Sequence, residues 1–418
     1  MRQVYSCLMY LLTPYLLLRL WWKGRALPAY RQRIGERFCI NKMQREPVDI
    51  WIHAVSLGEV IAATPLIDSL LNKQRQILVT TMTPTGSERV QQRFGQRVKH
   101  QYVPYDLPIV LCRFLKKNKP KVAVIVETEL WPNLIHYTAL AQIPLLLVNA
   151  RLSERSYRGY RKISFFLKPI LSQFKAILTQ TTDDAKRFKA LGANEDKVFV
   201  VGNMKFDLQT QDINADIFLT LKERWGKQRL VFIAASTHEG EEQQILTQLK
   251  KLQTSLPNLV LLIAPRHPER FQKIYQLSVQ LGFNTGRRSQ VETLSLDNEV
   301  VILDSLGELL GFYQVSDYAF VGGSLVPVGG HNMLEPIAMR VPVFTGPQVH
   351  NFKVICRDLQ EAEAIEMVAN ADDLIDRIID LQQDEAAKKI LIDNASAVLA
   401  ANKGAVARYV AEIEGCLQ

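Results

Sequence analysis

Phe320-Val-Gly-Gly-Ser-Leu-Val-Pro-Val-Gly-Gly-His-Asn-Met-Leu-Glu-Pro336 joins a predicted strand to a predicted helix. The apolar run Tyr318–Val321 predicts a buried strand, and Met333–Met339 predicts a short helix with Asn332 as its N-cap. The two glycine pairs let the backbone approach a ligand closely, and the helix start offers unpaired N–H groups to a phosphate. Glu335, one turn into the helix, is suited to accept both hydroxyls of a ribose. The stretch is therefore a candidate nucleotide site.

A tight connection between strand and helix, with glycines for geometry alone, explains this stretch equally well. It matches neither the dinucleotide pattern G-x-G-x-x-G nor the P-loop pattern G-x-x-x-x-G-K-[ST]. The missing patterns argue against hydride transfer and NTP hydrolysis.

On either side of this stretch, short apolar runs alternate with segments of helical periodicity, which is typical of parallel sheets with crossover helices. The expected strands are Asp49–Ala54, Ile77–Thr81, Val122–Val126, Leu145–Val148, Ala176–Thr179, Val198–Val201, Leu230–Ala234, Leu259–Ala264, Val300–Leu303, Tyr318–Val321, Val341–Phe344 and Ala364–Val368. The pattern pauses in a polar stretch between Gly202 and Arg229, and Asp372–Leu417 is expected to be helical. We therefore predict two doubly wound α/β domains in tandem.

Positive charge is concentrated near the start of the sequence. Residues 1–46 hold nine Lys or Arg and two Glu, so they account for +7 of the formal net charge of +9. The other 372 residues are nearly neutral, which argues against a nucleic-acid-binding globule.

The same region carries the one membrane signal. Val4–Trp22 is almost wholly apolar, although Pro14 and Arg19 interrupt it and its length is at the lower limit for a span. Trp21, Trp22 and the basic residues after them are typical of an anchor on anionic lipid. A cleaved signal peptide fits poorly because the charges follow the apolar run, and a buried core helix is the other alternative. We expect an anchor that spans the membrane or lies in its surface.

The expected compartment follows from charge and cysteine usage. Positive charge on the C-terminal side of the anchor leaves the rest of the chain in the cytoplasm. Five scattered cysteines without a C-x-x-C pair agree with a reducing compartment and argue against a cysteine metal site.

In doubly wound sheets, ligands bind beyond the carboxyl ends of the strands. In the first half, the polar residues at such positions are His53, Ser56, Glu59, Thr80–Ser87, Glu127, Glu129 and Asn149–Arg151. In the second half they are Ser236–His238, Arg266, His267, Leu306–Glu308 and the glycine-rich stretch. The second set suits a nucleotide and its phosphate, and the first suits a polar acceptor. A cleft between the two domains would bring a donor and an acceptor together.

Seven motifs resemble, in order, those of the 3-deoxy-D-manno-oct-2-ulosonic acid (Kdo) transferases of lipid A biosynthesis. They are His53-Ala-Val-Ser-Leu-Gly-Glu59, Thr80-Thr-Met-Thr-Pro-Thr-Gly-Ser-Glu88, Glu127-Thr-Glu-Leu-Trp-Pro-Asn133, Asn149-Ala-Arg-Leu-Ser153, Gly202-Asn-Met-Lys-Phe-Asp207, Pro265-Arg-His-Pro-Glu-Arg270 and Gly322–Pro336. The resemblance extends essentially from end to end. It implies an α/β fold of the GT-B type, with two Rossmann-like domains facing a cleft. It also implies CMP-Kdo as donor, lipid IVA as acceptor, and the cytoplasmic face of the inner membrane with its anionic lipids. No cofactor and no metal are implied.

With this resemblance we expect five parts. They are an apolar and basic membrane anchor at 1–46, an acceptor-binding Rossmann-like domain at 47–206, a join at 207–228, a donor-binding Rossmann-like domain at 229–370, and C-terminal helices at 371–418 that pack back toward the first domain.

The resemblance also assigns the chemistry. Glu59 is implied as the catalytic base, and Glu127 and Lys205 as groups that stabilise the transition state. The implied CMP pocket consists of Pro265, Arg266, Leu306, Gly307, Glu308, Asn332, Met333, Leu334 and Glu335. Without the resemblance, Glu59 would be interpreted as a first-turn glutamate favoured by the helix dipole, and Lys205 as a surface lysine. His238 and His331 have either a chemical role or one in loop hydrogen bonding.

Two other functions are alternatives to the transferase. A sugar-nucleotide epimerase or hydrolase can share the tandem-domain architecture, but the predicted anchor argues against it. A non-enzymatic adaptor at the membrane surface would leave the carboxylates at the strand ends without a purpose.

Overall fold

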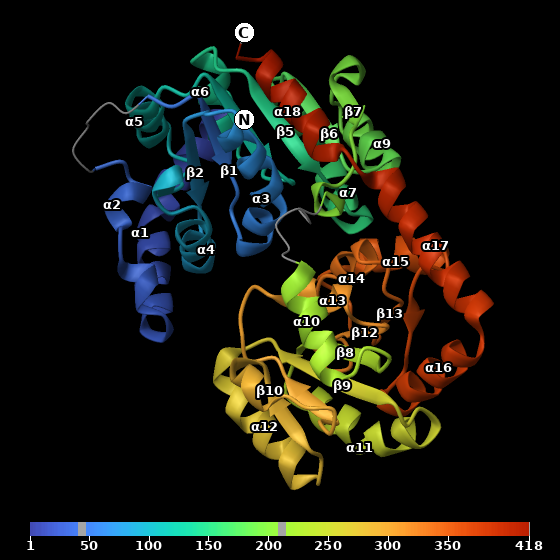
Figure 1. Ribbon diagram of the computed structural model, residues 1–418. Coiled ribbons are helices and arrows are strands. Elements are labelled where there is room, and N and C mark those ends of the chain that lie inside the picture. Colours follow the sequence, from blue (N-terminus) through green and yellow to red (C-terminus); the bar gives the residue numbers. More distant parts are fainter. Residues whose placement is uncertain (41–46, 208–214, 418) are drawn as a thin grey trace. The chain divides into compact units, whose positions relative to one another are not determined.

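The computed structural model describes residues 1–40, 47–207 and 215–417 (Figure 1). The chain forms two compact units: Met1–Asp207 with Asn402–Gln418, and Leu208–Ala401. Each unit contains a seven-stranded sheet, and every pair of neighbouring strands is parallel. The predicted α/β class with two parallel sheets is confirmed.

The first unit has the strand order β3-β2-β1-β4-β5-β6-β7. Its strands are β1 (Ile50–His53), β2 (Ile77–Thr81), β3 (Lys99–Tyr102), β4 (Val122–Val126), β5 (Leu145–Ala150), β6 (Ala176–Thr179) and β7 (Val198–Val200). Its α-helices are α1 (Arg2–Ala26), α2 (Ile34–Arg37), α3 (Leu57–Asn72), α4 (Pro84–Phe94), α5 (Pro108–Asn118), α6 (Pro132–Leu140), α7 (Glu154–Arg161), α8 (Ser164–Leu171), α9 (Thr182–Ala190) and α18 (Ala405–Gly415). Its 3₁₀ turns are η1 (Pro28–Arg31), η2 (Gly95–Arg97), η3 (Glu195–Lys197) and η4 (Met204–Phe206).

The second unit has the order β10-β11-β9-β8-β12-β13-β14. Its strands are β8 (Leu230–Thr237), β9 (Leu259–Pro265), β10 (Thr285–Arg287), β11 (Val300–Ile302), β12 (Tyr318–Val321), β13 (Val343–Thr345) and β14 (Glu366–Met367). Its helices are α10 (Ala215–Trp225), α11 (Glu241–Ser255), α12 (Phe271–Gln280), α13 (Leu309–Gln314), α14 (Leu334–Ala338), α15 (Lys353–Glu361), α16 (Ala371–Gln383) and α17 (Glu385–Asn402), with 3₁₀ turns η5 (Pro268–Arg270) and η6 (Arg288–Thr293).

The central strands are apolar on both faces because helices cover both faces. In β1, Ile50 and Ile52 belong to the core on one face of the sheet. Trp51 belongs to the core on the other face, where its ring meets that of Phe114 in α5 with centroids 4.7 Å apart. Successive side chains of a strand point to opposite faces of the sheet, so each strand contributes to two cores. Every position is then buried, which explains the continuous apolar runs of the sequence.

Two edge strands, β3 and β10, were not predicted. Their sequences are Lys-His-Gln-Tyr and Thr-Gly-Arg, without an apolar run. An edge strand pairs on one side only and is less covered, so its residues need not be apolar.

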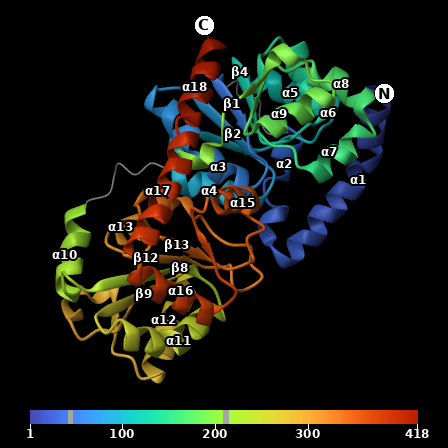
Figure 2. The ribbon, with the colours of Figure 1, turned by 90° about the vertical axis from the view of Figure 1, so that its right-hand side faces the viewer.

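The C-terminal residues divide between the units. Helix α18 packs on α3 of the first unit, and both views show it against that unit's sheet (Figures 1 and 2). The Asp207 carboxylate accepts hydrogen bonds from the N–H groups of Gly404 (2.6 Å) and Val406 (2.5 Å). The Tyr409 hydroxyl donates to the carbonyl of Gly202 at 2.7 Å. Helix α16 packs instead on α11 of the second unit.

Part of the predicted join is a structured helix. Phe218, Leu221 and Trp225 of α10 are buried in the second unit's core. Their spacing of three and four residues places them on one helix face. This spacing predicts a helix, but the surrounding polar residues made the segment look like a join. Residues 208–214 of the join lie outside the described residues.

Each sheet reverses its strand order near its centre. In the first unit this topological switch point lies between β1 and β4, and in the second between β8 and β12. Open parallel sheets bind ligands beyond the carboxyl ends of the strands at such points. Glu59 and Glu127 follow β1 and β4, and the glycine-rich stretch follows β12.

Candidate active site

Glu59 is held in the first turn of α3, two residues inside the helix start. The Ser56 side chain is the N-cap: its hydroxyl accepts from the Glu59 N–H at 3.3 Å and donates to Glu59 Oε1 at 2.9 Å. The Val55 N–H donates to Glu59 Oε2 at 2.7 Å. This arrangement is a variant of the capping box, so the carboxylate has one orientation at the end of β1.

Burial raises the pKa of Glu59 to about 8. The hydrogen bonds from Val55 and Ser56 oppose this rise, whereas the nearby carboxylates Glu129 and Glu127 add to it. A carboxylate whose pKa lies near the working pH is a far better base than an ordinary surface glutamate.

Glu127 directly follows β4 in a left-handed backbone conformation, with a φ of 60°. Its N–H donates a hydrogen bond to the carbonyl of Val148 in β5 at 2.9 Å. Such a conformation costs about 1–3 kcal/mol for a non-glycine residue and persists where the surroundings enforce it. Here the next residue, Thr128, donates its hydroxyl to the carbonyl of Arg151. The backbone after β4 is therefore held to β5 and to Arg151, the residue that follows β5.

Glu129 is a third carboxylate in this group; the sequence placed it among the polar residues at strand ends but gave it no catalytic role. Trp131 Nε1 donates to Glu129 Oε2 at 2.6 Å, and the Trp131 ring lies edge-on to His53 with centroids 5.3 Å apart. Burial raises the pKa of Glu129, the Trp131 hydrogen bond lowers it, and Glu127 raises it further. Its position two residues after Glu127 was the available signal.

Lys205 lies in the turn η4 and is electrostatically coupled to the same group. Burial lowers the pKa of Lys205, Glu127 raises it and Arg151 lowers it. Asn203 caps the turn by accepting from the Lys205 N–H at 3.0 Å. Lys205 is therefore a partly buried cation of the carboxylate group, not a plain surface lysine. The structure thus brings together the three predicted catalytic residues.

In the second unit, Glu241 of α11 organises the glycine-rich stretch. Its buried carboxylate accepts four backbone hydrogen bonds, from His238 N (2.9 Å), Gly323 N (2.7 Å), Ser324 N (3.0 Å) and Leu325 N (2.9 Å). Glu241 was not among the predicted site residues, because an acidic residue in a helix's first turn is usually explained by the helix dipole.

Gly322 shows why one glycine of this stretch is needed. A Cβ atom there would lie 2.8 Å from Glu241 Oε2 and 2.8 Å from the Ser236 carbonyl oxygen. Only glycine allows this approach of the loop to the end of β8.

The predicted donor residues lie at the ends of neighbouring strands. Pro265 ends β9 and is followed by the exposed Arg266, Leu306–Glu308 precede α13, and Asn332–Glu335 lead into α14. Strands β11, β9, β8 and β12 are consecutive in the sheet, so these ends meet at one edge. Glu308 accepts from Arg288 at 2.8 Å in an ion pair, which leaves less of its carboxylate for a ligand.

The predicted N-cap is wrong by one residue. Helix α14 begins at Leu334 with Met333 as its N-cap, because Asn332 Oδ1 accepts from the Leu334 N–H at 3.2 Å as part of the preceding loop. Asn332 also donates through Nδ2 to Glu335 Oε1 at 3.0 Å. Burial raises the pKa of Glu335, whereas this hydrogen bond and Arg266 lower it. The Glu335 carboxylate is therefore bound to Asn332 through Oε1 and lies near the cation of Arg266.

His238 and His331 are hydrogen-bonded to each other, with their Nε2 atoms 2.8 Å apart. Burial, together with the charges of His238, Arg266 and His267, lowers the pKa of His331 to about 4. One Nε2 must therefore donate and the other accept, and the pair is neutral at pH 7. This arrangement supports a role in hydrogen bonding.

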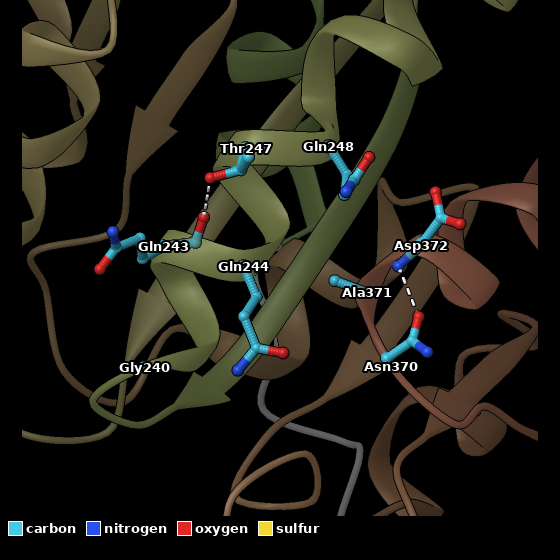
Figure 3. Close-up of a pocket in the computed structure, with 8 residues that line it drawn as sticks. All are labelled: Gly240, Gln243, Gln244, Thr247, Gln248, Asn370, Ala371 and Asp372. Atoms are coloured by element: carbon cyan, nitrogen blue, oxygen red, sulfur yellow. Dashed lines mark hydrogen bonds between the residues drawn. The ribbon is translucent and has the colours of Figure 1, made fainter.

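A separate surface cavity of about 500 Å³ lies between α11 and the start of α16 (Figure 3). Its lining residues are Gly240, Gln243, Gln244, Thr247, Gln248, Asn370, Ala371 and Asp372. None of these lining residues is basic, and none belongs to the predicted donor pocket. The cavity thus offers no side-chain cation to a nucleotide phosphate.

The comparisons with known proteins agree with this geometry. Residues 32–208 match the family model described as 3-Deoxy-D-manno-octulosonic-acid transferase (kdotransferase). The chain is 42% identical to the 3-deoxy-D-manno-octulosonic acid transferase of Haemophilus influenzae over 92% of this chain and 91% of that protein. It is 32% identical to the enzyme of the same name from Bordetella pertussis, over 88% of this chain and 87% of that protein. A glycosyltransferase structure from Rickettsia africae aligns with a TM-score of 0.54 over 90% of this chain and 99% of that chain; at 14% identity, this likeness shows the fold alone.

Proposed function

Because the chain belongs to the family of Kdo transferases, glycosyltransferases of lipopolysaccharide biosynthesis, we propose that it transfers Kdo from CMP-Kdo to lipid IVA. In this reaction a hydroxyl of lipid IVA attacks the anomeric carbon of Kdo, and the bond to the CMP phosphate breaks. Attack from the face opposite the leaving group inverts the configuration in one step.

The observation that carries this proposal is the environment of Glu59. Its carboxylate is buried, is held by two hydrogen bonds at the switch point, and has a pKa raised to about 8. Glu59 takes the proton of the attacking hydroxyl as the new C–O bond forms. Proton removal makes the hydroxyl oxygen a stronger nucleophile in the transition state.

Glu127 and Lys205 are the proposed transition-state groups. Glu127 raises the pKa of Lys205 and so opposes the lowering caused by burial. A cation and a carboxylate beside Glu59 are suited to the charge that shifts from the sugar to the leaving phosphate. We assign both residues to stabilisation of that charge.

The proposed donor pocket is in the second unit. Arg266 contacts the phosphate of CMP, because its exposed guanidinium presents a fixed fork of donors. Glu335 accepts from the ribose hydroxyls, and Pro265, Leu306–Glu308 and Asn332–Leu334 complete the pocket. The Glu241 carboxylate keeps the glycine-rich stretch in the shape that this pocket needs.

The proposed location is the cytoplasmic face of the inner membrane. Helix α1 is apolar enough over Arg2–Arg25 to enter a membrane, and basic residues follow it. Lipid IVA is itself a membrane lipid, so an enzyme that binds to the same surface meets its acceptor there.

Transfer from CMP-Kdo to lipid IVA by the purified protein, with CMP release as readout, tests the proposal. The Glu59→Gln variant should turn over roughly 10²–10⁴-fold more slowly, because the amide cannot take the proton. CMP affinity should stay nearly unchanged, because the proposed donor pocket lies in the other unit. EDTA should have little effect on the wild-type rate. Near-wild-type transfer by the Gln variant, or a trapped Kdo–protein adduct, would contradict the mechanism.

A further inference from the structure

Helix α1 lies along the first unit and is covered on one side only (Figure 2). The covered or partly covered residues recur every three or four positions. They are Arg2, Tyr5, Ser6, Met9, Thr13, Leu16, Leu20 and Gly24. This spacing is that of one helix face, so α1 has a side that faces the protein and a side that does not.

Polar bonds fasten the covered side. The Ser6 hydroxyl donates to Asn133 Oδ1 at 2.9 Å, and Arg2 Nη1 donates to the same atom at 3.3 Å. Tyr5 forms a side-chain hydrogen bond with the buried carboxylate of Asp106. Nearer the C-terminal end, Leu20 packs with Tyr105, Leu107 and Val110. The helix is thus part of the first unit over most of its length.

The other side exposes large apolar side chains. They are Met1, Val4, Leu8, Tyr10, Leu11, Leu12, Tyr15, Leu17, Leu18, Trp21 and Trp22. Leu11 is 78% exposed and Trp22 is 69% exposed. An apolar surface of this extent on a folded protein marks a site of interaction with a membrane or a partner.

Charge identifies the occupant as a lipid surface. The exposed cations Arg19, Lys23 and Arg25 lie within or just after the apolar run, where anionic headgroups would meet them. The guanidinium groups of Arg25 and Arg31 lie 4.6 and 5.0 Å from the Trp21 ring centre, and Arg31 also donates to the Trp21 carbonyl. Tryptophan and arginine together are typical of the boundary between lipid tails and headgroups.

We propose that α1 lies in the plane of an anionic lipid bilayer and does not cross it. A crossing helix is surrounded by lipid or by other membrane-spanning segments. The covered side of α1 instead contacts Asn133 and Asp106, polar residues next to a parallel sheet, which cannot enter the hydrocarbon region. This inference deepens the proposed function, because it states how the enzyme meets its lipid acceptor.

Exposed apolar residues beside α1 extend the membrane surface. Ile109, at the start of α5, is 52% exposed, and its N–H donates to the Tyr10 hydroxyl at 3.4 Å. Phe165 in α8 is 63% exposed, and the ring of its neighbour Phe166 lies 6.4 Å from that of Tyr5. The proposed bilayer contact therefore also includes residues of the first unit outside α1.

The orientation is tested by fluorophores at three exposed positions of α1. Val4→Cys, Leu11→Cys and Leu18→Cys are labelled one at a time in a chain whose accessible cysteines, Cys7, Cys39, Cys112 and Cys416, are replaced by serine. Each labelled protein is bound to vesicles of phosphatidylglycerol and phosphatidylethanolamine. Lipids brominated at different depths then report the depth of each label. A helix in the membrane plane places all three labels at similar, shallow depth. A deep label at residue 11 with residues 4 and 18 near opposite surfaces would overturn the proposal, and so would an absence of quenching at all three, which would indicate a protein partner.

A second measurement tests the role of the apolar side. The double variant Leu11→Glu/Leu18→Glu should lose about tenfold or more of its vesicle-bound fraction. The matched control Leu219→Glu/Leu296→Glu, with two exposed leucines of the second unit, should bind like wild type. Both variants should keep wild-type transfer to acceptor dispersed in detergent. If the wild type transfers no Kdo in detergent, the proposed function fails, whereas the vesicle measurements still decide the orientation of α1. Equal vesicle binding by the two double variants would contradict the inference.

Discussion

The Oδ1 atom of Asn149 accepts a hydrogen bond from the backbone N–H of Met204 at 3.1 Å. Asn149 is fully buried in β5, where the register shifts between Leu147 and Ala150, and its φ is 51°. Asparagine tolerates this left-handed conformation better than most residues. This bond connects a distortion of the sheet to the turn that carries Lys205.

Replacing Asn149 should therefore slow turnover without touching the substrate directly. Asn149→Ala and Asn149→Gly both remove the acceptor for Met204, and we expect about a 10²-fold loss of kcat in each because Lys205 is misplaced. The glycine variant tolerates the positive φ, so it should be more stable than the alanine variant by about 1 kcal/mol in urea unfolding. Wild-type kcat in the glycine variant would show that the hydrogen bond does not position Lys205.

The pH dependence of the reaction should report the pKa of Glu59. A base acts when it is deprotonated, so kcat/KM should rise with pH and level off above about 8. Because the Glu129 charge contributes to this raised pKa, Glu129→Gln should shift the rise to lower pH. Glu195→Gln, an exposed carboxylate in the same unit, should leave the profile in place. A shift to higher pH in Glu129→Gln would contradict the assignment of Glu59 as base.

Glu241→Gln should weaken both the second unit and its ligand affinity. The amide offers one acceptor oxygen to four backbone N–H groups and turns its own N–H₂ toward them. We expect a loss of about 2–4 kcal/mol in the free energy of unfolding, together with weaker CMP binding. Glu239→Gln, on the exposed side of the same turn, is the control and should unfold at the same denaturant concentration as wild type. Unchanged stability in Glu241→Gln would remove its role as the organiser of the glycine-rich stretch.

Arg266→Ala should weaken the binding of the phosphate of CMP but not that of the nucleoside. Its proposed partner is the phosphate, so affinity for CMP should fall roughly tenfold or more while affinity for cytidine stays nearly constant. Isothermal titration with both ligands measures this difference. Arg377→Ala in α16 removes a comparable exposed cation and should change neither affinity. Equal losses for CMP and cytidine would contradict the phosphate contact.

Much of the fold could be predicted because parallel strands buried on both faces are continuous apolar runs. Ile77–Thr81, Val122–Val126, Ala176–Thr179 and Tyr318–Val321 have the predicted bounds. The polar edge strands β3 and β10 could not be predicted in this way. They are strands because they pair with a neighbouring strand, and their own composition gives no sign of it.

The candidate site could be predicted only in part. Residue type and position after a strand pointed to Glu59, Glu127 and the glycine-rich stretch, because a parallel sheet gathers strand ends at one edge. Glu241 and Asn149 could not be recognised as organisers, because their partners are backbone N–H groups of segments distant in the sequence. A backbone donor leaves no mark on sequence composition.

The N-terminal helix shows most clearly what the sequence determined and what the tertiary structure determined. The sequence by itself determined that Val4–Trp22 is apolar and that basic residues follow it, which is enough to predict contact with a lipid surface. It could not determine the orientation of the helix, because side chains on all sides of it are apolar and no periodicity separates them. Only the tertiary structure shows which side of the helix the protein covers: Ser6 and Tyr5 bind Asn133 and Asp106, whereas the large apolar side chains on the other side are exposed.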